Sequence, residues 1–210
     1  MRAEIVFNEA SILLRGRKRI LIVADLHLGL VDFYDEELIK KVNEMAERFD
    51  ADELIVLGDL KHSIGRSRRV ERILEDVNVP MTLVRGNHDG KLKGLRCIKI
   101  GKFGLFHGHL IPDEEVLNSK VLILAHAHPS VLMDYGVKER VWVIGEWDGR
   151  KVIVMPAFND LCASTPVNIC KPAGFIFRRW NYMEAEAITL DGVLLGKIKN
   201  LQFFNSSKTY

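Results

Sequence analysis

The chain has 210 residues, 48% of them hydrophobic and 28% charged, and a formal net charge of +2. This balance predicts one globular domain over residues 1–210, and so small a net charge does not by itself favour nucleic acid as a partner. The apolar runs are far too short to span a bilayer, and acidic residues stand where a signal peptide has its apolar core, so we expect a cytoplasmic protein rather than a membrane or secreted one.

Strands and helices alternate in the first part of the chain. Short apolar runs predict strands near 3–7, 11–14, 19–24, 53–57 and 81–84. Between them, helical periodicity predicts a helix over 35–49, with Leu38, Val42 and Met45 on one face, and another near 67–76. This order is typical of βαβ units.

The pattern changes after Gly94, where strands follow one another without long helices. They are expected near 95–100, 102–106, 120–125, 141–145, 151–155, 174–178, 182–189 and 193–198. The letters LDGV at 190–193 contain the Asp-Gly pair of a tight hairpin. The two halves together predict a mixed α/β sandwich.

Five of the predicted strands end in side chains of the kinds that bind metal ions. The runs are RILIVADLHLG, DELIVLGDLKH, MTLVRGNHDG, FGLFHGHL and KVLILAHAHP, and they contain all seven histidines of the chain. Their polar ends hold Asp25, His27, Asp59, His62, Asn87, His88, Asp89, His107, His109, His126 and His128. Open α/β sheets place their binding sites at this carboxyl edge.

A single histidine is more often structural than a ligand, and His126 and His128 alone could form a polar stripe on an edge strand. Five coincident strand ends favour a metal site instead. Carboxylates and imidazoles gathered without a cation would be partly desolvated, and their negative groups would repel one another.

Seven of these side chains are the candidate ligands: Asp25, His27, Asp59, Asn87, His107, His126 and His128. They are too many for one ion that keeps a position open for substrate, so we expect two ions, with Asp59 as the carboxylate that bridges them. Imidazole, carboxylate and amide ligands without thiolate favour Mn²⁺, or otherwise Ni²⁺, Fe²⁺, Co²⁺ or Zn²⁺, over Mg²⁺ and Ca²⁺.

The motifs resemble those of the calcineurin-like metallophosphoesterase superfamily. In the family's order, residues 20–130 contain D-x-H at 25–27, G-D at 58–59, G-N-H-D at 86–89, H-G at 107–108 and H-x-H at 126–128. The compact length is similar to the small prokaryotic branch related to SbcD-type nucleases. One departure is Ala125, which stands where the family usually has glycine before the last histidine pair.

The resemblance implies a fold and two ligand sets. The fold is a double β-sandwich of two mixed sheets flanked by α-helices. One ion would be held by Asp25, His27, Asp59 and His128, and the other by Asp59, Asn87, His107 and His126.

The expected chemistry follows from two neighbouring positive charges. They lower the pKa of a bridging water to near neutrality, and the resulting hydroxide could attack the phosphorus of a phosphoester. His88, which matches the family's GNHD histidine, is the expected catalytic residue and would protonate the leaving oxygen. The alternative is that His88 only orients Asn87. We expect Asp89 to fix the turn or to orient His88, and we leave His62 and His109 outside the site.

The predicted function is therefore metal-dependent hydrolysis of phosphomonoesters or phosphodiesters. A nuclease of the same chemistry is the alternative, disfavoured because the catalytic fold uses nearly all 210 residues and leaves no separate region to cap DNA. A non-catalytic metal-binding scaffold ranks last, because no ligand is missing. The oligomeric state is not readable from the sequence.

Several other features are expected to be structural. The basic runs RGRKR at 15–19 and GRSRRVER at 65–72 are expected to be solvated faces. Packing rather than base stacking is expected of Trp142, Trp147 and Trp180. An odd number of cysteines without CxxC spacing predicts reduced, mostly buried thiols at Cys97, Cys162 and Cys170. The turn-rich segment MPAFNDLCASTPVN at 155–168 is expected near the mouth of the site.

Overall fold

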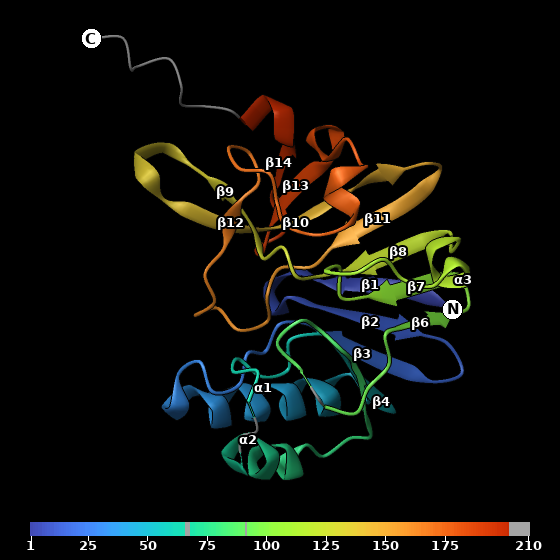
Figure 1. Cartoon of the computed structure of the whole chain (residues 1–210), viewed down its shortest axis with the longest axis vertical. Helices are drawn as coiled ribbons and strands as arrows, with labels where there is room; N and C mark the ends of the chain where they lie inside the picture. Colours follow the sequence, from blue (N-terminus) through green and yellow to red (C-terminus); the bar gives the residue numbers. More distant parts are fainter. Residues whose placement is uncertain (66–67, 91, 202–210) are drawn as a thin grey trace.

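Two mixed β-sheets stack face to face, and α-helices cover one outer face (Figure 1). The computed structural model describes residues 1–65, 68–90 and 92–201. Apolar side chains form three cores, one between the sheets and one on the outer face of each. The double β-sandwich expected from the sequence is confirmed.

The first sheet has the strand order β1-β2-β3-β4-β5. Its strands are β1 (Arg2–Val6), β2 (Ser11–Arg15), β3 (Arg19–Val23), β4 (Glu53–Leu57) and β5 (Met81–Val84). The first three pair antiparallel, whereas β3, β4 and β5 are parallel and are joined through α1 (Asp35–Arg48) and α2 (Arg68–Ile73). Because these three strands are parallel, their carboxyl ends lie at the same edge.

The second sheet has the order β12-β9-β10-β11-β8-β7-β6, with β13 beside β10 and β14 beside β13. Its strands are β6 (Cys97–Ile100), β7 (Phe103–Phe106), β8 (Val121–Leu124), β9 (Pro129–Leu132), β10 (Lys138–Trp147), β11 (Arg150–Val154), β12 (Thr165–Pro166), β13 (Glu186–Thr189) and β14 (Leu194–Lys197). Since β7 and β8 are parallel neighbours, the loops that follow them leave the sheet side by side.

Side-chain alternation along the strands explains the layers. In β3, Ile22 faces the second sheet and Val23 faces the helices. Helix α1 buries its predicted apolar face, Leu38, Val42 and Met45, against the helix side of the sheet. None of the helices in the described ranges has the length and apolarity that a membrane crossing requires.

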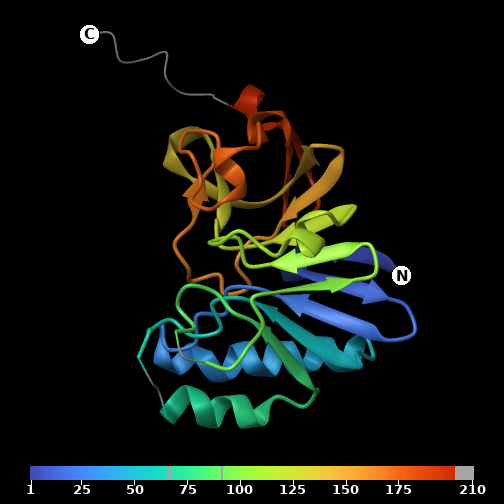
Figure 2. The same ribbon diagram turned by 45° about the vertical axis from the view of Figure 1, so that its right-hand side comes forward.

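Short helical turns complete the fold. They are α3 (Glu114–Leu117) and the 3₁₀ turns η1 (Phe7–Glu9), η2 (Asp32–Tyr34), η3 (Leu74–Asp76), η4 (Asp134–Gly136), η5 (Ile176–Arg178), η6 (Tyr182–Glu184) and η7 (Ile198–Leu201). The last three belong to irregular chain that covers the outer face of the second sheet, on the side of the molecule opposite α1 and α2 (Figure 2).

The C-terminal cover corrects two strand predictions. The strand expected at 174–178 is wrong, because Phe175 has a helical backbone and the buried Ile176 and Phe177 pack onto the sheet instead of pairing in it. The strand expected at 182–189 begins as η6 and is extended only in β13. An apolar run that covers a sheet and one that joins it have the same sequence pattern. Strands β9 and β12 were not predicted at all.

Candidate metal centre

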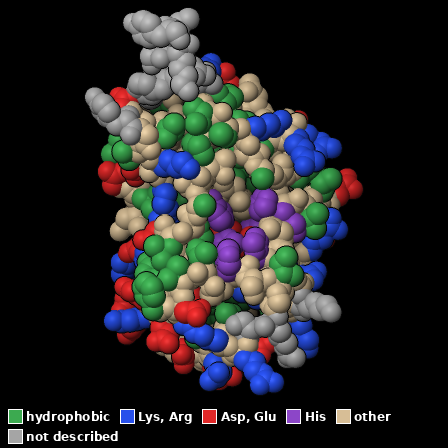
Figure 3. Space-filling model, turned by 60° about the vertical axis from the view of Figure 1, so that its left-hand side comes forward, with side chains coloured by type: hydrophobic (Ala, Val, Ile, Leu, Met, Phe, Trp, Pro, Cys, Tyr) green, Lys and Arg blue, Asp and Glu red, His purple; other side chains and the backbone are tan. Residues whose placement is uncertain are grey.

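Loops from both sheets bring the seven predicted ligands to one edge of the sandwich, where all but Asn87, which follows β5, are buried or half-buried. Asp25 and His27 follow β3, Asp59 follows β4, His107 follows β7, and His126 and His128 follow β8. Figure 3 shows the histidines gathered in one patch on the surface of the molecule.

Two buried carboxylates lie among the imidazole rings. Asp25 Oδ1 is 3.3 Å from His128 Nε2 and 3.7 Å from His107 Nδ1. Asp59 Oδ2 is 3.3 Å from His107 Nε2 and 3.6 Å from His27 Nε2. Asp25 and Asp59 are 0% and 2% exposed, so these charges are close together and largely shielded from water.

Asp59 belongs to two groups of possible ligand atoms. One group is Asp25, His27 and Asp59, and the other is Asp59, His107 and His126; within each group the ligand atoms all lie within 4.8 Å of one another. A carboxylate shared by two such groups is placed to bridge two cations.

Several ligand atoms of this cluster have no hydrogen-bond partner within the described part of the chain. They are Asp25 Oδ1, both ring nitrogens of His27, and His107 Nε2. Buried polar atoms without partners are unfavourable, and native proteins contain few of them. Divalent cations would satisfy the lone pairs of Asp25 Oδ1, His107 Nε2 and one ring nitrogen of His27, so the residues present fit a metal centre.

Backbone carbonyls orient two of the rings. His107 Nδ1 donates to the Leu57 carbonyl at 3.0 Å, and His128 Nδ1 donates to the Ala163 carbonyl at 3.0 Å. In this tautomer, the Nε2 of each ring keeps its lone pair for a cation.

Burial and neighbouring charge set the pKa values in the cluster. Burial lowers the pKa of His27 and of His126 to about 4, so both rings are neutral at neutral pH. Burial also acts to lower the pKa of His128, but the carboxylate of Asp25 outweighs it and raises the pKa to about 9. Burial is likewise outweighed at His107, whose pKa is raised by the neighbouring carboxylates. A binding cation therefore displaces protons chiefly from His128 and His107.

Five predicted ligands have a left-handed backbone, with φ of 55° at Asp25, 45° at His27, 49° at Asp59, 71° at His126 and 42° at His128. Residues other than glycine seldom adopt this conformation. The loops after β3 and β4 hold each other in it, because the N–H of Asp25 donates to the Gly58 carbonyl at 3.0 Å and that of His27 to the Asp59 carbonyl at 2.9 Å. Strain concentrated at one sheet edge is typical of a functional site.

Two motif glycines make room for the ligands. A Cβ at Gly58 would lie 2.1 Å from His107 Nδ1, and one at Gly86 would lie 2.0 Å from Asp59 Oδ1. Either methyl group would overlap the side chain it meets. By contrast, the methyl group of Ala125 lies in the core between the sheets, so alanine is accommodated there.

Asp89 ties the loops after β4 and β5 together. Its buried carboxylate accepts the backbone N–H groups of Asp59 at 3.0 Å, Leu60 at 2.9 Å and Gly86 at 2.6 Å. These contacts fix the turn.

His88, the predicted catalytic residue, lies against the cluster. Its N–H donates to Asp59 Oδ1 at 2.8 Å, and its ring centre is 4.9 Å from that of His27. The Nδ1 of His88 contacts the carbonyl of His62. The buried ammonium of Lys61 donates to the His88 carbonyl at 3.0 Å and so helps to hold this turn.

Asn87, the seventh predicted ligand, follows β5 at the same edge of the sandwich and is exposed. It lines a shallow hollow with Arg85 and His109. The ring of His109 lies 5.3 Å from that of His107 and 6.0 Å from that of His126, so the hollow borders the second group.

The segment 155–168 lies against the site, and sequence reasoning assigned it no contacts. The buried Asn159 donates to the Leu26 carbonyl at 2.9 Å, and the Ala163 carbonyl accepts from His128. Cys162 places its sulfur beside His27 and His128. A backbone carbonyl has no sequence signature, and the turn-rich composition was the only available signal.

The remaining expectations concern cysteines and tryptophans. Cys97 and Cys162 are half-buried, but Cys170 is exposed, which corrects the expectation of mostly buried thiols. Its position in a turn after β12, rather than in a strand, explains the difference. Trp142 and Trp180 are buried in the cores, as expected of packing residues.

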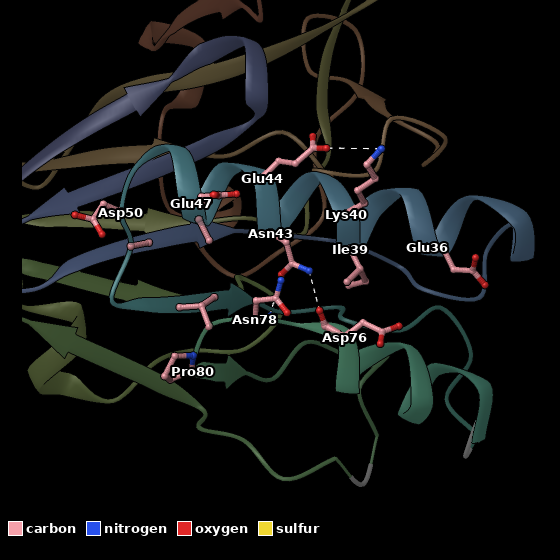
Figure 4. A pocket seen from close by; sticks show the side chains of 13 residues that line it. Glu36, Ile39, Lys40, Asn43, Glu44, Glu47, Asp50, Asp76, Asn78 and Pro80 are labelled. Atoms are coloured by element: carbon pink, nitrogen blue, oxygen red, sulfur yellow. Dashed lines mark hydrogen bonds and ion pairs between the residues drawn. The ribbon is translucent and has the colours of Figure 1, made fainter.

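A second hollow lies along α1 (Figure 4). There Asn43 donates to the Asp76 carbonyl at 2.7 Å and accepts the N–H of Asn78 at 3.0 Å. These bonds tie α1 to the chain that precedes β5, at the amino edge of the strand and so opposite the candidate metal centre.

Comparison with known proteins agrees with this geometry. Residues 18–162 match the family model of the calcineurin-like phosphoesterases. The chain belongs to this family. Members of the family hydrolyse phosphoesters with divalent metal ions, so the chain is a metal-dependent hydrolase, and the shared Asp59 fits the dinuclear centre that the family implies. No curated protein matches the chain.

Solved structures resemble the chain at low sequence identity. The nuclease MPE of Pseudomonas putida matches with a TM-score of 0.70 at 20% identity, covering 92% of this chain and 94% of that one. A phosphoesterase from E. coli, YfcE, matches with a TM-score of 0.44 at 19% identity, covering 85% and 97% of the two chains. A single mutant of Vps29 from Entamoeba histolytica matches with a TM-score of 0.41 at 20% identity, covering 70% of this chain and 78% of that one. The first likeness shows a shared fold.

Proposed function

We propose that this chain hydrolyses phosphoesters at a dinuclear centre that Asp59 bridges, within a single domain built on both sheets. The observation that carries the proposal is the membership of Asp59 in two groups of close ligand atoms. Asp25, His27, Asp59 and His128 would hold one divalent ion, and Asp59, Asn87, His107 and His126 the other. Mn²⁺ is the first expectation, with Ni²⁺, Fe²⁺, Co²⁺ and Zn²⁺ as alternatives.

Bound at these residues, two divalent ions would lower the pKa of a shared water and neutralise the charge of the phosphate. The protein supplies the geometry. Carbonyls of Leu57 and Ala163 hold the rings of His107 and His128, and the Asp89 carboxylate fixes the turn that carries Asp59. His88, whose ring lies beside that of His27, would donate a proton to the leaving oxygen of the substrate.

The acid role of His88 is tested by changing both the residue and the leaving group. The variant His88→Ala should keep its metal ions and lose roughly 10²–10⁴-fold in kcat on alkyl phosphoesters, because a general acid acts in the transition state. The loss should be much smaller on nitrophenyl esters, whose leaving group needs little protonation. Equal losses across the series would indicate instead that His88 only orients Asn87.

The substrates that we propose are simple phosphomonoesters or phosphodiesters. The histidine patch lies open on the surface in Figure 3, and an open site selects weakly. Metal-free protein should be inactive on a phosphoester panel and should recover activity when Mn²⁺ or Ni²⁺ is added. Absence of turnover with every metal and ester, despite bound metal, would contradict the proposed hydrolysis. We place this reaction in the cytoplasm, because the three cysteines are free thiols.

A nuclease is the second candidate, and the likeness to the nuclease MPE supports it. The two basic runs of the chain do not support a nuclease. Arg69 is held by Asp32 and Asp35, each 2.7 Å away. Arg66 lies outside the described residues, and Arg68 and Arg72 are exposed. RGRKR turns between β2 and β3, at the edge opposite the site, where Arg15 pairs with Glu4 at 2.8 Å.

The small net charge of the chain and the ion pairs of Arg69 predict weak binding to duplex DNA. Each phosphate contact contributes a slope of about −0.9 in log affinity against log salt, so the slope should be shallow. Long DNA should not be degraded efficiently where a model phosphoester is turned over. Robust exonuclease activity that disappears in Arg68→Ala would favour the nuclease over the general phosphoesterase.

A further inference from the structure

Cys162 lies at the side of the centre formed by His27 and His128. One ligand atom from each of these three residues lies within 4.8 Å of the other two. Neither other cysteine is comparable, since Cys97 begins β6 and Cys170 is exposed beyond β12. The ligand sets that the family implies contain no thiol.

Hydrogen bonds to the site loops fix the position of this cysteine. On one side, Asn159 Nδ2 donates to the Leu26 carbonyl, between Asp25 and His27 in sequence, at 2.9 Å. On the other side, the Ala163 carbonyl accepts from His128 Nδ1 at 3.0 Å. Cys162 lies between these two anchors, so the loops that present His27 and His128 also place its sulfur.

Unpartnered atoms at the same spot also point to a bound ligand. His27 is only 5% exposed, and both of its ring nitrogens are buried without a hydrogen-bond partner in the described part of the chain. Among the described residues, the sulfur of Cys162 has only a long hydrogen-bond contact, 3.9 Å, to the backbone carbonyl oxygen of Asp25. A cation between these groups would satisfy the imidazole and the sulfur together.

We propose that Cys162 is a thiolate ligand of the ion held by His27 and His128. The inference rests on the proposed dinuclear centre and adds a donor to it. Coordination forms a metal–sulfur bond and releases the thiol proton to solvent. The two carboxylates Asp25 and Asp59 leave two divalent ions with excess positive charge, which a thiolate reduces. A soft sulfur donor favours Zn²⁺, Fe²⁺ or Co²⁺ over Mn²⁺ at this position.

Absorption spectra of the cobalt-loaded full-length chain test this ligand. The wild type should show a thiolate-to-cobalt charge-transfer band in the near ultraviolet together with the visible d–d bands. Cys162→Ser should lose the charge-transfer band and keep the d–d bands. The double variant Cys97→Ser/Cys170→Ser is the matched control and should retain both.

Calorimetry gives a second readout. Cys162→Ser should raise the Kd for Cd²⁺ at least about tenfold, because Cd²⁺ is a soft ion that prefers sulfur. The Kd for Mn²⁺, which prefers oxygen ligands, should change much less. Wild-type protein that binds cobalt with d–d bands but no charge-transfer band would overturn the thiolate ligand and leave the dinuclear centre standing. Failure to bind cobalt at all would overturn both.

Discussion

His126 presents its ring to the centre from a backbone that favours glycine. Its φ is 71°, where a side chain costs roughly 1–2 kcal/mol relative to glycine. Among metal-free variants, His126→Gly should therefore unfold at higher urea concentration than His126→Ala, by about 1 kcal/mol in the free energy of unfolding. Both variants should lose the ion that His126 helps to hold.

His107 provides the control, because its φ is not in the left-handed region. There the order should reverse, with His107→Ala more stable than His107→Gly, since glycine loses more conformational entropy on folding. If alanine were also the more stable replacement at His126, the ligand backbone would not be strained.

The charge of His128 makes the stability of the metal-free protein depend on pH. The carboxylate of Asp25 overcomes the effect of burial and raises the folded-state pKa of His128 to about 9, above the unfolded value of about 6.5. Its stabilising contribution is thus complete below pH 6.5 and is lost as pH rises through about 9. The Tm of chelator-treated protein should fall over this interval, whereas His128→Asn, which tolerates a φ of 42°, should show a flatter profile. A Tm that rises from pH 6.5 to 9 would contradict this assignment.

Residue types alone predicted most of the cluster. Carboxylates and imidazoles at strand ends identified Asp25, Asp59 and His107, because few other roles bring such side chains to one sheet edge. The contribution of Ala163 could not be predicted, since any residue offers the same carbonyl. Cys162 was overlooked because it does not stand at the end of a predicted strand, where the other candidate ligands were found.

At the level of elements, the loops after β4 and β5 fit together only because Gly86 has no side chain. A Cβ there would lie 2.0 Å from Asp59 Oδ1 and 2.4 Å from the Asp59 nitrogen. Gly86→Ala should displace Asp59 and raise the Kd of both ions at least about tenfold, since changes in the residues that contact metal ligands alter metal affinity to that extent. The matched control is Gly65→Ala, whose added Cβ would meet nothing within 4 Å. Calorimetry measures the Kd of Mn²⁺ for both variants. An unchanged Kd in Gly86→Ala would mean that the loops after β4 and β5 can move apart without loss of metal affinity.

Strands that have a clear apolar run in their own sequence could be predicted. Segments whose conformation depends on contacts with distant parts of the chain could not. The strands β3, β4 and β8 alternate between two cores and end in polar residues, so their apolar runs indicated both the strand and its end. Strand β9 begins at Pro129, directly after His128, where the motif gave no strand signal. The run at 174–178 is apolar because it covers a sheet, and only the finished sandwich distinguishes that role from pairing.

For the molecule as a whole, the centre depends on how the two sheets are stacked. Asp25, His27 and Asp59 come from the first sheet, and His107, His126 and His128 come from the second. The core between the sheets, which includes Ile22, Ile123 and Trp142, holds these two sets in register. In the ligand sets that we propose, neither sheet alone holds all the ligands of either ion, so metal binding should depend on the assembled sandwich.

Calorimetric titration of Asp59→Asn with Mn²⁺ tests the bridged centre most directly. Asparagine tolerates the φ of 49° at this position, so the substitution removes the charge of the carboxylate and keeps the backbone. Wild-type protein should bind two ions per chain, Asp59→Asn should bind both of them much more weakly, and His128→Asn should lose mainly one. Binding of two ions to Asp59→Asn with wild-type affinity would contradict the bridging role of Asp59, on which the function proposed for this chain rests.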